Sequence, residues 1–387
     1  MRVLLVQPLS RGGIAQYTFQ LACALSDAGA QVILLAPADY ELASRLAKAG
    51  TQPRFIPGLR PSVSLARRSP ARLLRRLLMA LASIIDCYRL LIISHAVGPD
   101  VIHVQGGHPM DILYLLAARF SRRPLIYTAH NVLPHRPAPY HRLLHRLVYR
   151  LPDFTIVHTQ HGRAQLLGIF RPRPHRVRVI PMPLFELFDP RDSPPPASAR
   201  ASLGLGADDE IVLFFGQIRP NKGLPTLLRA IAHLRRTRPN IRLLIAGEPL
   251  DGMKEVLSAI QELGLGASIT LRAAYVPLDQ VPNYLQAADV VALPYLRVTQ
   301  SAVLSVALAF NKPVVASHVG GLPELAESSG IACLVPPEDH VALAKAISAL
   351  LDNPSTATKQ SHGLRWPEAA HMTAELYLQA AGCGRQN

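Results

Sequence analysis

Two basic residues stand three positions apart in a short segment bounded by glycines, Gly216-Gln-Ile-Arg-Pro-Asn-Lys-Gly223. An apolar run typical of a buried strand, residues 210–215, precedes the segment, and a helical pattern follows it. Arg219 offers a planar pair of N–H donors and Lys222 a compact positive charge, and both suit phosphate oxygens. The spacing therefore predicts a diphosphate site at the end of a strand. The alternative is a pair of solvated surface cations.

The rest of the chain must position this site, and its short apolar runs alternate with helical patterns. This alternation is typical of parallel sheets with crossover helices, so the predicted fold class is α/β. The stretch Pro194-Pro-Pro196 separates two series of strands, which predicts two Rossmann-like domains. The expected strands are residues 2–7, 31–36, 101–104, 125–129, 154–158 and 177–180, then 210–215, 242–246, 268–272, 290–293, 313–316 and 331–335.

The length of 387 residues and the hydrophobic fraction of 49% are sufficient for two domains with cores. We expect an N-terminal domain at residues 1–190 and a C-terminal domain at residues 191–365. Residues 366–387 contain a helical stripe of apolar side chains that needs a surface to pack on.

A glycine turn, Arg11-Gly12-Gly13, lies between the first expected strand and a helical pattern. Glycine lets backbone N–H groups and a helix N-terminus approach an anion closely. The spacing is not GxGxxG, which argues against a dinucleotide-dependent oxidoreductase. A tight turn without a ligand is the alternative.

The order of these motifs resembles glycosyltransferase family 4, whose members are retaining enzymes of GT-B fold. The segment from Gly216 to Gly223 is similar to the family's donor-diphosphate site, and the resemblance covers essentially the whole chain. Further similar pieces are Ile245-Ala-Gly-Glu248, Ala287-Ala-Asp-Val-Val-Ala-Leu-Pro-Tyr295, Lys312-Pro-Val-Val-Ala316, Gly320-Gly-Leu-Pro-Glu324 and Gly330-Ile-Ala-Cys-Leu-Val-Pro336. The resemblance implies two Rossmann-like domains facing a cleft, with the C-terminal helix crossing back to the N-domain. It also implies donor binding by Gly12, Gly13, Gly216, Arg219 and Lys222.

Thr128-Ala-His-Asn131 follows the fourth expected strand, where the resemblance implies a histidine beside the transferred sugar. We expect His130 to have this role, together with Arg219 and Lys222 in catalysis, because a neutral imidazole can bond sugar hydroxyls without adding charge. A structural histidine is the alternative.

One departure from the family concerns two glutamates, eight residues apart, which would contact the sugar and the ribose. Val298 and Val306 stand at those positions, so neither carboxylate is carried over. The backbone N–H groups of Ser301 and Ala302, at the start of an apolar helix, remain candidates to bind phosphate.

Positive charge is concentrated in the first half of the chain. Residues 1–190 contain 24 Lys+Arg and 9 Asp+Glu, whereas residues 191–387 contain 17 of each, so the first half carries the whole net charge of +15. An amphipathic helix with leucines and a basic face is a candidate for contact with an anionic membrane surface. A core helix with a solvated arginine face is the alternative. The arginines are Arg67, Arg68, Arg72, Arg75 and Arg76, and a second such patch is residues 140–150.

These observations predict a glycosyltransferase that moves a sugar from a nucleotide-sugar donor to a lipid-linked or saccharide acceptor, with retention of configuration. The alternative is a non-catalytic relative that binds nucleotide or lipid. We expect no metal and no other cofactor, because cations and helix N-termini can neutralise the diphosphate. The four scattered cysteines and the lack of a membrane-spanning run predict a cytoplasmic protein, peripheral on the inner face of the membrane. No base-stacking or helix-turn-helix signature supports nucleic-acid binding.

Overall fold

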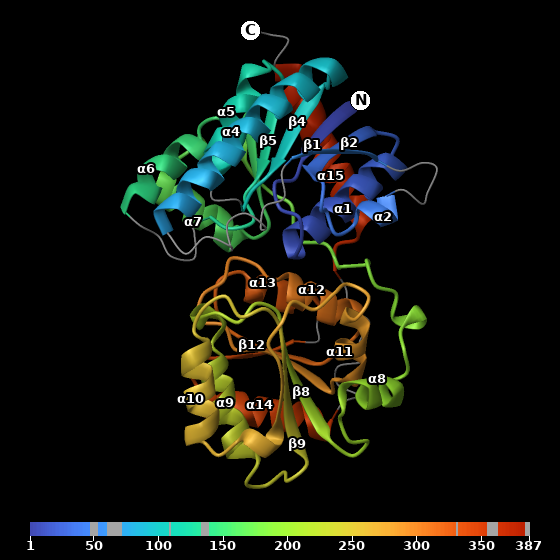
Figure 1. Cartoon of the computed structure of the whole chain (residues 1–387), viewed down its shortest axis with the longest axis vertical. Coiled ribbons are helices and arrows are strands. Elements are labelled where there is room, and N and C mark those ends of the chain that lie inside the picture. Colours follow the sequence, from blue (N-terminus) through green and yellow to red (C-terminus); the bar gives the residue numbers. More distant parts are fainter. Residues whose placement is uncertain are drawn as a thin grey trace. The chain divides into compact units, whose positions relative to one another are not determined.

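The computed structural model describes residues 1–46, 53–59, 72–107, 110–132, 139–329, 332–353 and 363–383. For residues 72–80, 139–142, 328–329, 332 and 383 it describes the backbone alone. The chain divides into two compact units, one containing Met1–Pro183 and the segment from Leu364 onward, the other containing Leu184–Gly363. Each unit has its own parallel sheet, which confirms the predicted α/β class (Figure 1).

The sheet of the first unit has seven parallel strands in the order β3-β2-β1-β4-β5-β6-β7. Its strands are β1 (Arg2–Val6), β2 (Gln31–Pro37), β3 (Arg54–Leu59), β4 (Val101–Gln105), β5 (Leu125–Thr128), β6 (Phe154–Val157) and β7 (Val177–Val179). Strand β3 was not predicted, because Pro57 and Gly58 interrupt its sequence. It lies at the edge of the sheet, where a proline without an amide hydrogen is tolerated.

Helices cover both faces of this sheet. On one face, Leu4 and Val6 of β1 join Leu90, Ile112 and other buried side chains of the helices in a common core. On the other face, α1 (Gly13–Asp27) and α15 (Trp366–Cys383) pack against each other, as Figure 1 shows. The helices around the first face are α4 (Arg72–Val97), α5 (Asp111–Phe120), α6 (Pro139–Val148) and α7 (Gln160–Phe170), and the short helices are α2 (Ala43–Leu46) and η1 (Pro174–Arg176).

The C-terminal helix α15 belongs to the first unit although the second unit precedes it in the chain. Its buried side chains include Ala369, Leu376, Tyr377 and Ala380, which are the apolar positions of the predicted stripe. The helix contacts β4 and β5 as well as α1. The predicted return of the last helix to the N-domain is therefore confirmed.

The second unit has a six-stranded parallel sheet in the order β10-β9-β8-β11-β12-β13. Its strands are β8 (Glu210–Phe215), β9 (Ile241–Ala246), β10 (Ile269–Arg272), β11 (Val290–Leu293), β12 (Val314–Ser317) and β13 (Ala332–Val335). All four residues of β11 are fully buried, as expected for a central strand covered on both faces. The helices are α8 (Pro196–Leu203), α9 (Leu224–Leu234), α10 (Met253–Glu262), α11 (Val281–Ala287), α12 (Ala302–Ala309), α13 (Leu322–Ser329) and α14 (His340–Asp352), with η2 (Pro190–Asp192), η3 (Pro220–Lys222) and η4 (Gly266–Ser268).

Candidate functional site

The segment with the two spaced cations forms the turn between β8 and α9. It starts at Gly216, contains the short helix η3 and ends at Gly223. Both glycines have positive φ angles, 109° and 66°. A Cβ atom added to Gly223 would collide with the carbonyl oxygen of Pro294, so only glycine fits this close approach. The turn is thereby pressed against the segment that follows β11.

Backbone hydrogen bonds fix this turn to both neighbouring strand ends. The Ile218 N–H donates to the Glu248 carbonyl oxygen at 2.9 Å, and the Leu296 N–H donates to the Asn221 carbonyl oxygen at 2.9 Å. The Asn221 side-chain amide donates to the Arg297 carbonyl oxygen at 3.2 Å. Three motifs far apart in the sequence therefore meet at the carboxyl ends of β9, β8 and β11, where parallel sheets usually hold their ligands.

Arg219 and Lys222 both project from this anchored turn and are half-buried. The Lys222 Nζ atom lies 3.7 Å from the centre of the Tyr295 ring, and Tyr295 is buried. A cation over an aromatic face is attracted by the ring and loses freedom of movement. The ring thus holds the ammonium group in place without neutralising its charge.

The start of α12 lies beside the start of the same turn. A Cβ atom added to Gly216 would lie 3.3 Å from Val303 Cγ2, in the first turn of α12. Ser301 is the N-cap of this helix, and its hydroxyl oxygen accepts a hydrogen bond from the Leu304 N–H at 3.2 Å. Ala302 is the first helical residue. A helix N-terminus and two cations are therefore brought together within one unit, and this combination favours an anion.

The two valines at the expected glutamate positions have different surroundings. Val306 is buried in α12, and Val298 is half-buried in the preceding segment. A Cβ atom added to Gly320 would collide with the Val298 carbonyl oxygen, so the Gly320 motif packs closely against this segment. The site therefore offers the backbone of residues 298–302, but not the two carboxylates.

Gly12 and Gly13 lie in the first unit, at the start of α1. Gly12 is the N-cap and has a φ of 91°, and none of the described residues would touch an added Cβ, so the backbone angle is what favours glycine here. The Gly12 N–H donates to the Glu41 carboxylate at 2.7 Å. The Gly12 N–H, which was predicted to bind the nucleotide-sugar donor, is thus bonded in the structure to the Glu41 carboxylate.

His130 lies two residues beyond β5 and is 1% exposed. Its Nε2 atom is 2.9 Å from Gln105 Oε1, and its Nδ1 atom is 3.3 Å from His158 Nε2. Burial, and then the nearby His158 and His103, hold the pKa of His130 well below its ordinary value, so the ring is neutral at pH 7. Both ring nitrogens already have protein partners.

The partners of His130 were not singled out from the sequence. Gln105 ends β4 and His158 follows β6, and Tyr17 of α1 packs edge-on to both His130 and His158 at 5.0 Å between ring centres. Gln105 and His158 stand at the carboxyl ends of β4 and β6, the two neighbours of β5 in the sheet. The sequence analysis predicted all three strands, so this shared position could have indicated the two residues.

The predicted basic face is only partly described. Arg67 and Arg68 lie outside the described residues, and Arg72, Arg75 and Arg76 lie in the part of α4 described by its backbone alone. Among the helices of the described chain, none combines the length and apolar character needed to cross a membrane. Within the same residues, no three histidine, cysteine or acidic side chains are grouped to hold a metal ion.

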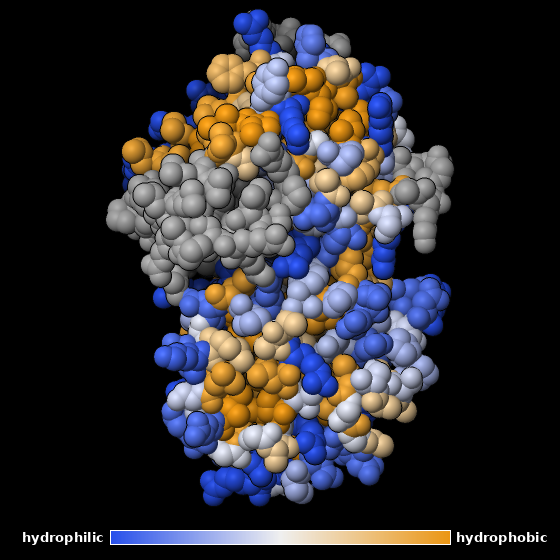
Figure 2. All heavy atoms as spheres, in the orientation of Figure 1, coloured by the Kyte–Doolittle hydropathy of each residue, from blue (hydrophilic) through white to orange (hydrophobic). Residues whose placement is uncertain are grey.

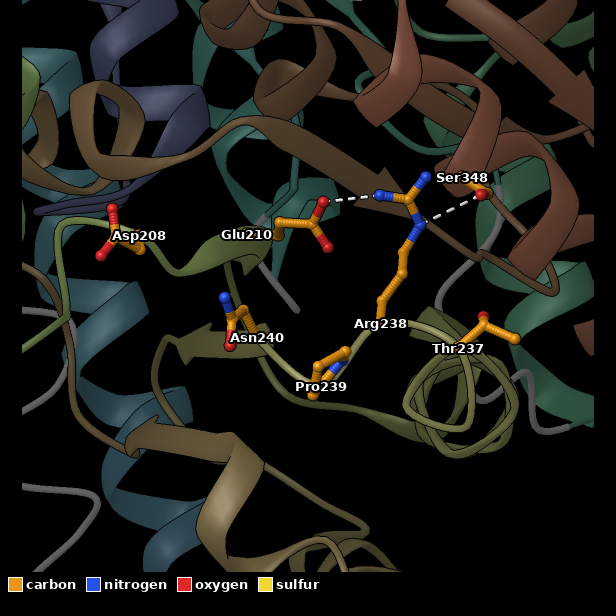
Figure 3. Close-up of a pocket in the computed structure, with 7 residues that line it drawn as sticks. All are labelled: Asp208, Glu210, Thr237, Arg238, Pro239, Asn240 and Ser348. Carbon is orange, nitrogen blue, oxygen red and sulfur yellow. Dashed lines mark hydrogen bonds and ion pairs between the residues drawn. The ribbon is translucent and has the colours of Figure 1, made fainter.

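A separate hollow of about 480 Å³ lies at the opposite, amino-terminal ends of β8 and β9, and Figure 3 shows its lining. Arg238 crosses it, donating to Glu210 at 2.5 Å and to Ser348 at 3.1 Å, and it also pairs with Asp352. These partners satisfy the guanidinium group. The charged side chains that line the hollow therefore form a structural ion-pair network. They lie at the opposite end of β8 from the turn that contains Arg219 and Lys222.

Comparison with known proteins agrees with this architecture. Residues 11–184 match the family described as Glycosyltransferase Family 4, and residues 209–353 match that described as Glycosyl transferases group 1. A D-inositol 3-phosphate glycosyltransferase from Saccharomonospora viridis is 30% identical over 311 residues, which cover 74% of this chain and 71% of that protein. One from Mycobacteroides abscessus is 31% identical over 276 residues, 66% of this chain. The chain spans only 61% of the length of that second relative.

Two solved structures share the fold along nearly the whole chain. HepE from Anabaena, solved with UDP and glucose, has a TM-score of 0.73 at 21% identity and covers 97% of this chain and 99% of its own. Sucrose-phosphate synthase from Thermosynechococcus elongatus has a TM-score of 0.71 at 22% identity and covers 100% of this chain and 98% of its own. The motifs, the two parallel sheets and these matches together establish that the chain belongs to glycosyltransferase family 4, with the GT-B fold.

Proposed function

We propose that this protein is a glycosyltransferase that takes a sugar from a nucleotide-sugar donor and transfers it to an acceptor hydroxyl with retention of anomeric configuration. The observation that carries this proposal is the anchored turn of Arg219 and Lys222 beside the N-terminus of α12. As the bond between sugar and diphosphate breaks, negative charge develops on the leaving diphosphate. Fixed cations and helix N–H groups stabilise this charge more in the transition state than in the bound donor.

The same turn supports a reaction that needs no metal ion. Arg219 and Lys222 supply two positive charges where a metal would otherwise neutralise the diphosphate, and the backbone at Ser301 and Ala302 adds N–H groups. Transfer should continue at an unchanged rate after exhaustive treatment with a chelator. A rate that falls, and returns with a divalent ion, would show that the cations are insufficient.

We also propose that His130 lies beside the transferred sugar, as family membership implies. Its ring is neutral and held on both sides by Gln105 and His158, so it can shape the reacting centre without adding charge. His130→Ala should lower kcat more than it raises KM for the donor. Equal donor binding and an unchanged kcat would remove His130 from the site.

We propose that the acceptor is presented at an anionic membrane surface, because the first unit exposes an apolar face flanked by arginines. On α4, the exposed side chains recur at the three- and four-residue spacing of one helical face. Helix α5 packs against both α4 and α6, and all three helices carry exposed apolar side chains; orange surface is visible over this region in Figure 2. This apolar face consists of Leu81, Ile84, Tyr88, Ile92, Leu116, Phe120, Leu143 and Leu147.

Two properties of the apolar face favour a lipid surface. Phe120 is 76% exposed and Tyr88 is 65% exposed, and aromatic side chains are favoured at the headgroup level. The same three helices, and the residues directly after α5 and α6, carry exposed arginines, which can contact anionic lipids. They are Arg89, Arg119, Arg122, Arg123, Arg146 and Arg150. We therefore propose a lipid-linked acceptor and a peripheral position on the cytoplasmic face of the membrane.

The decisive experiment incubates the purified protein with a set of nucleotide sugars and two acceptor classes, a lipid-linked acceptor in vesicles and inositol phosphate. The expected result is a glycosylated lipid whose anomeric configuration, read by NMR, equals that of the donor. Inverted configuration would overturn retention, and transfer to inositol phosphate alone would overturn the lipid acceptor.

A second candidate is a non-catalytic relative that binds nucleotide or lipid, and the replacement of two glutamates by Val298 and Val306 favours it. Tight nucleotide binding without hydrolysis or transfer for any donor would support this alternative. Measurable turnover with one donor would eliminate it.

A further inference from the structure

A continuous chain of buried polar side chains runs through the first unit from the C-terminal helix to the loop after β7. The Tyr377 hydroxyl lies 2.6 Å from His103 Nδ1, and His103 Nε2 lies 3.1 Å from the Gln105 amide. The series of hydrogen bonds continues from Gln105 to His130 at 2.9 Å and from His130 to His158 at 3.3 Å. His158 Nδ1 ends it, 2.9 Å from the carbonyl oxygen of Ile180. All five side chains are buried.

The direction of these hydrogen bonds can be derived from the last one. The Ile180 carbonyl oxygen can only accept, so His158 Nδ1 must carry a hydrogen and, in a neutral ring, His158 Nε2 has none. His130 Nδ1 must then donate to His158 Nε2. It follows that a neutral His130 has no hydrogen on Nε2 and can only accept there.

This result decides how the Gln105 amide is oriented. Its oxygen and nitrogen have nearly the same size, so hydrogen-bond directions must distinguish them. With the oxygen toward His130, two acceptors would face each other across 2.9 Å. With the nitrogen toward His130, Gln105 donates to His130 Nε2 and accepts from His103 Nε2.

The remaining bonds then agree in direction. The single hydrogen on His103 Nε2 is shared between the Gln105 oxygen at 3.1 Å and Thr128 Oγ1 at 2.7 Å, which leaves His103 Nδ1 to accept from the Tyr377 hydroxyl. Every member is satisfied with all three histidines neutral. The opposite amide orientation requires an imidazolium at His130 or at His158. Burial holds the pKa of His130 well below its ordinary value and lowers the pKa of His158 to about 4.

We propose that His158, Gln105, His103 and Tyr377 are positioning residues for His130: His158 sets the neutral tautomer with its hydrogen on Nδ1, and Gln105, held by His103 and Tyr377, fixes the direction in which the ring faces. The tautomer of His130 is set by His158 and the Ile180 carbonyl oxygen, whereas the placement of Gln105 beside its Nε2 atom depends on contacts that reach α15. The C-terminal helix thereby helps to set the geometry at His130. The effect on transfer rests on the proposed function of His130, whereas the hydrogen-bond directions do not.

The directions are tested by NMR on the full-length protein with ¹⁵N-labelled histidine at pH 7, with the three rings assigned by single substitutions. The expected result is a hydrogen on Nδ1 of His130, on Nδ1 of His158 and on Nε2 of His103. A hydrogen on Nε2 of His130, or a charged His158, overturns the proposal. This measurement on the wild-type protein stands even where a variant fails to fold.

The positioning role is tested by Gln105→Leu, which removes the amide and keeps a similar volume. The matched control is Gln20→Leu, because Gln20 is also buried in the first unit but is not one of the hydrogen-bonded side chains that link Tyr377 to His158. Gln105→Leu should lower kcat about tenfold and change the ¹⁵N signals of His130, while KM for the nucleotide sugar changes by less than about twofold. Gln20→Leu should leave kcat and those signals unchanged.

The two levels of the proposal fail separately. If the hydrogens lie as expected but Gln105→Leu keeps the wild-type kcat, the positioning role is wrong. If the wild-type protein transfers no sugar, the proposed function fails and the positioning role with it, while the NMR result still decides the hydrogen-bond directions.

Discussion

The Lys222 ammonium nitrogen lies 3.7 Å from the centre of the buried Tyr295 ring. Lys222 belongs to the turn after β8 and Tyr295 to the segment after β11, so the contact joins two of the strand ends that form the candidate diphosphate site. Within the described part of the chain, the Tyr295 hydroxyl has no hydrogen-bond partner. The ring face, rather than the hydroxyl, is therefore what Tyr295 contributes to this site.

This relationship predicts opposite outcomes for two substitutions of Tyr295. Tyr295→Phe keeps the ring and should leave nucleoside diphosphate affinity unchanged, because the lost hydroxyl had no partner. Tyr295→Leu removes the ring and should weaken that affinity about twofold to thirtyfold, as expected for a cation–π contact of about 0.5 to 2 kcal/mol. Calorimetric titration measures both. Equal weakening in the two variants would show that the ring face is not what matters.

Gly223 should tolerate no side chain. Gly223→Ala combines a positive φ with a collision at the Pro294 carbonyl oxygen, so we expect the turn to be displaced and donor binding to be lost. Gly264→Ala is the matched control, since Gly264 has a similar φ of 61° but no described residue within 4 Å of an added Cβ. The control should cost only the backbone strain, about 1 to 2 kcal/mol of unfolding free energy. Similar losses of donor binding in both variants would contradict this account.

The buried histidines predict that acid destabilises the first unit. Burial lowers the pKa of His103 to about 3 and that of His158 to about 4, whereas both have ordinary values near 6.5 when unfolded. Between pH 6.5 and 4 the unfolded chain therefore binds more protons, and stability falls as the pH is lowered through this window. Each histidine lowers the free energy of unfolding by at most about 1.4 kcal/mol for each pH unit of acidification in this window.

The only tryptophan of the chain, Trp366, is buried in the first unit and reports its unfolding by fluorescence. The urea midpoint should be lower at pH 5 than at pH 7 and constant between pH 7 and pH 8. A midpoint that does not change between pH 7 and pH 5 would show that the histidines are not held neutral.

The apolar face of α4, α5 and α6 predicts loss of membrane binding on substitution. The double variant Tyr88→Ser, Phe120→Ser should lower the fraction bound to anionic vesicles about tenfold or more. The reason is that burying each aromatic side chain in the lipid contributes roughly 1.5 to 3 kcal/mol of binding free energy. The control is Leu378→Ser, which removes an equally exposed apolar side chain from α15, on the other face of the sheet. Flotation of the wild-type protein and both variants measures binding. Unchanged flotation of the double variant would exclude this surface.

Much of the fold could be predicted because its signals are local. The strand of residues 210–215 and the glycine-bounded turn after it are contiguous in the sequence, and the structure has both where the pattern placed them. Strand β3 could not be predicted in the same way, because its pairing with β2 at the sheet edge overrides the proline and glycine within it.

The site around His130 shows why the rest required the structure. His103, Gln105 and His158 were unremarkable as single residues, since their meaning depends on strand register and on a tyrosine of the last helix. Lys222 was predicted to bind phosphate from its spacing to Arg219, but its contact with Tyr295 joins positions far apart in the chain. Arginines beside leucines in the sequence predicted contact with a membrane surface, and the structure adds exposed aromatic side chains, Tyr88 and Phe120, that this pattern did not indicate.

The central claim is that the turn from Gly216 to Gly223 binds the donor diphosphate, and titration of nucleoside diphosphates into single variants tests it most directly. Arg219→Ala and Lys222→Ala should each weaken binding about tenfold to a hundredfold, the size expected for charge-assisted hydrogen bonds of about 1.5 to 3 kcal/mol. Arg229→Ala and Lys254→Ala, which remove exposed cations of the same unit, should bind as the wild type does. Wild-type affinity in both Arg219→Ala and Lys222→Ala would contradict the account.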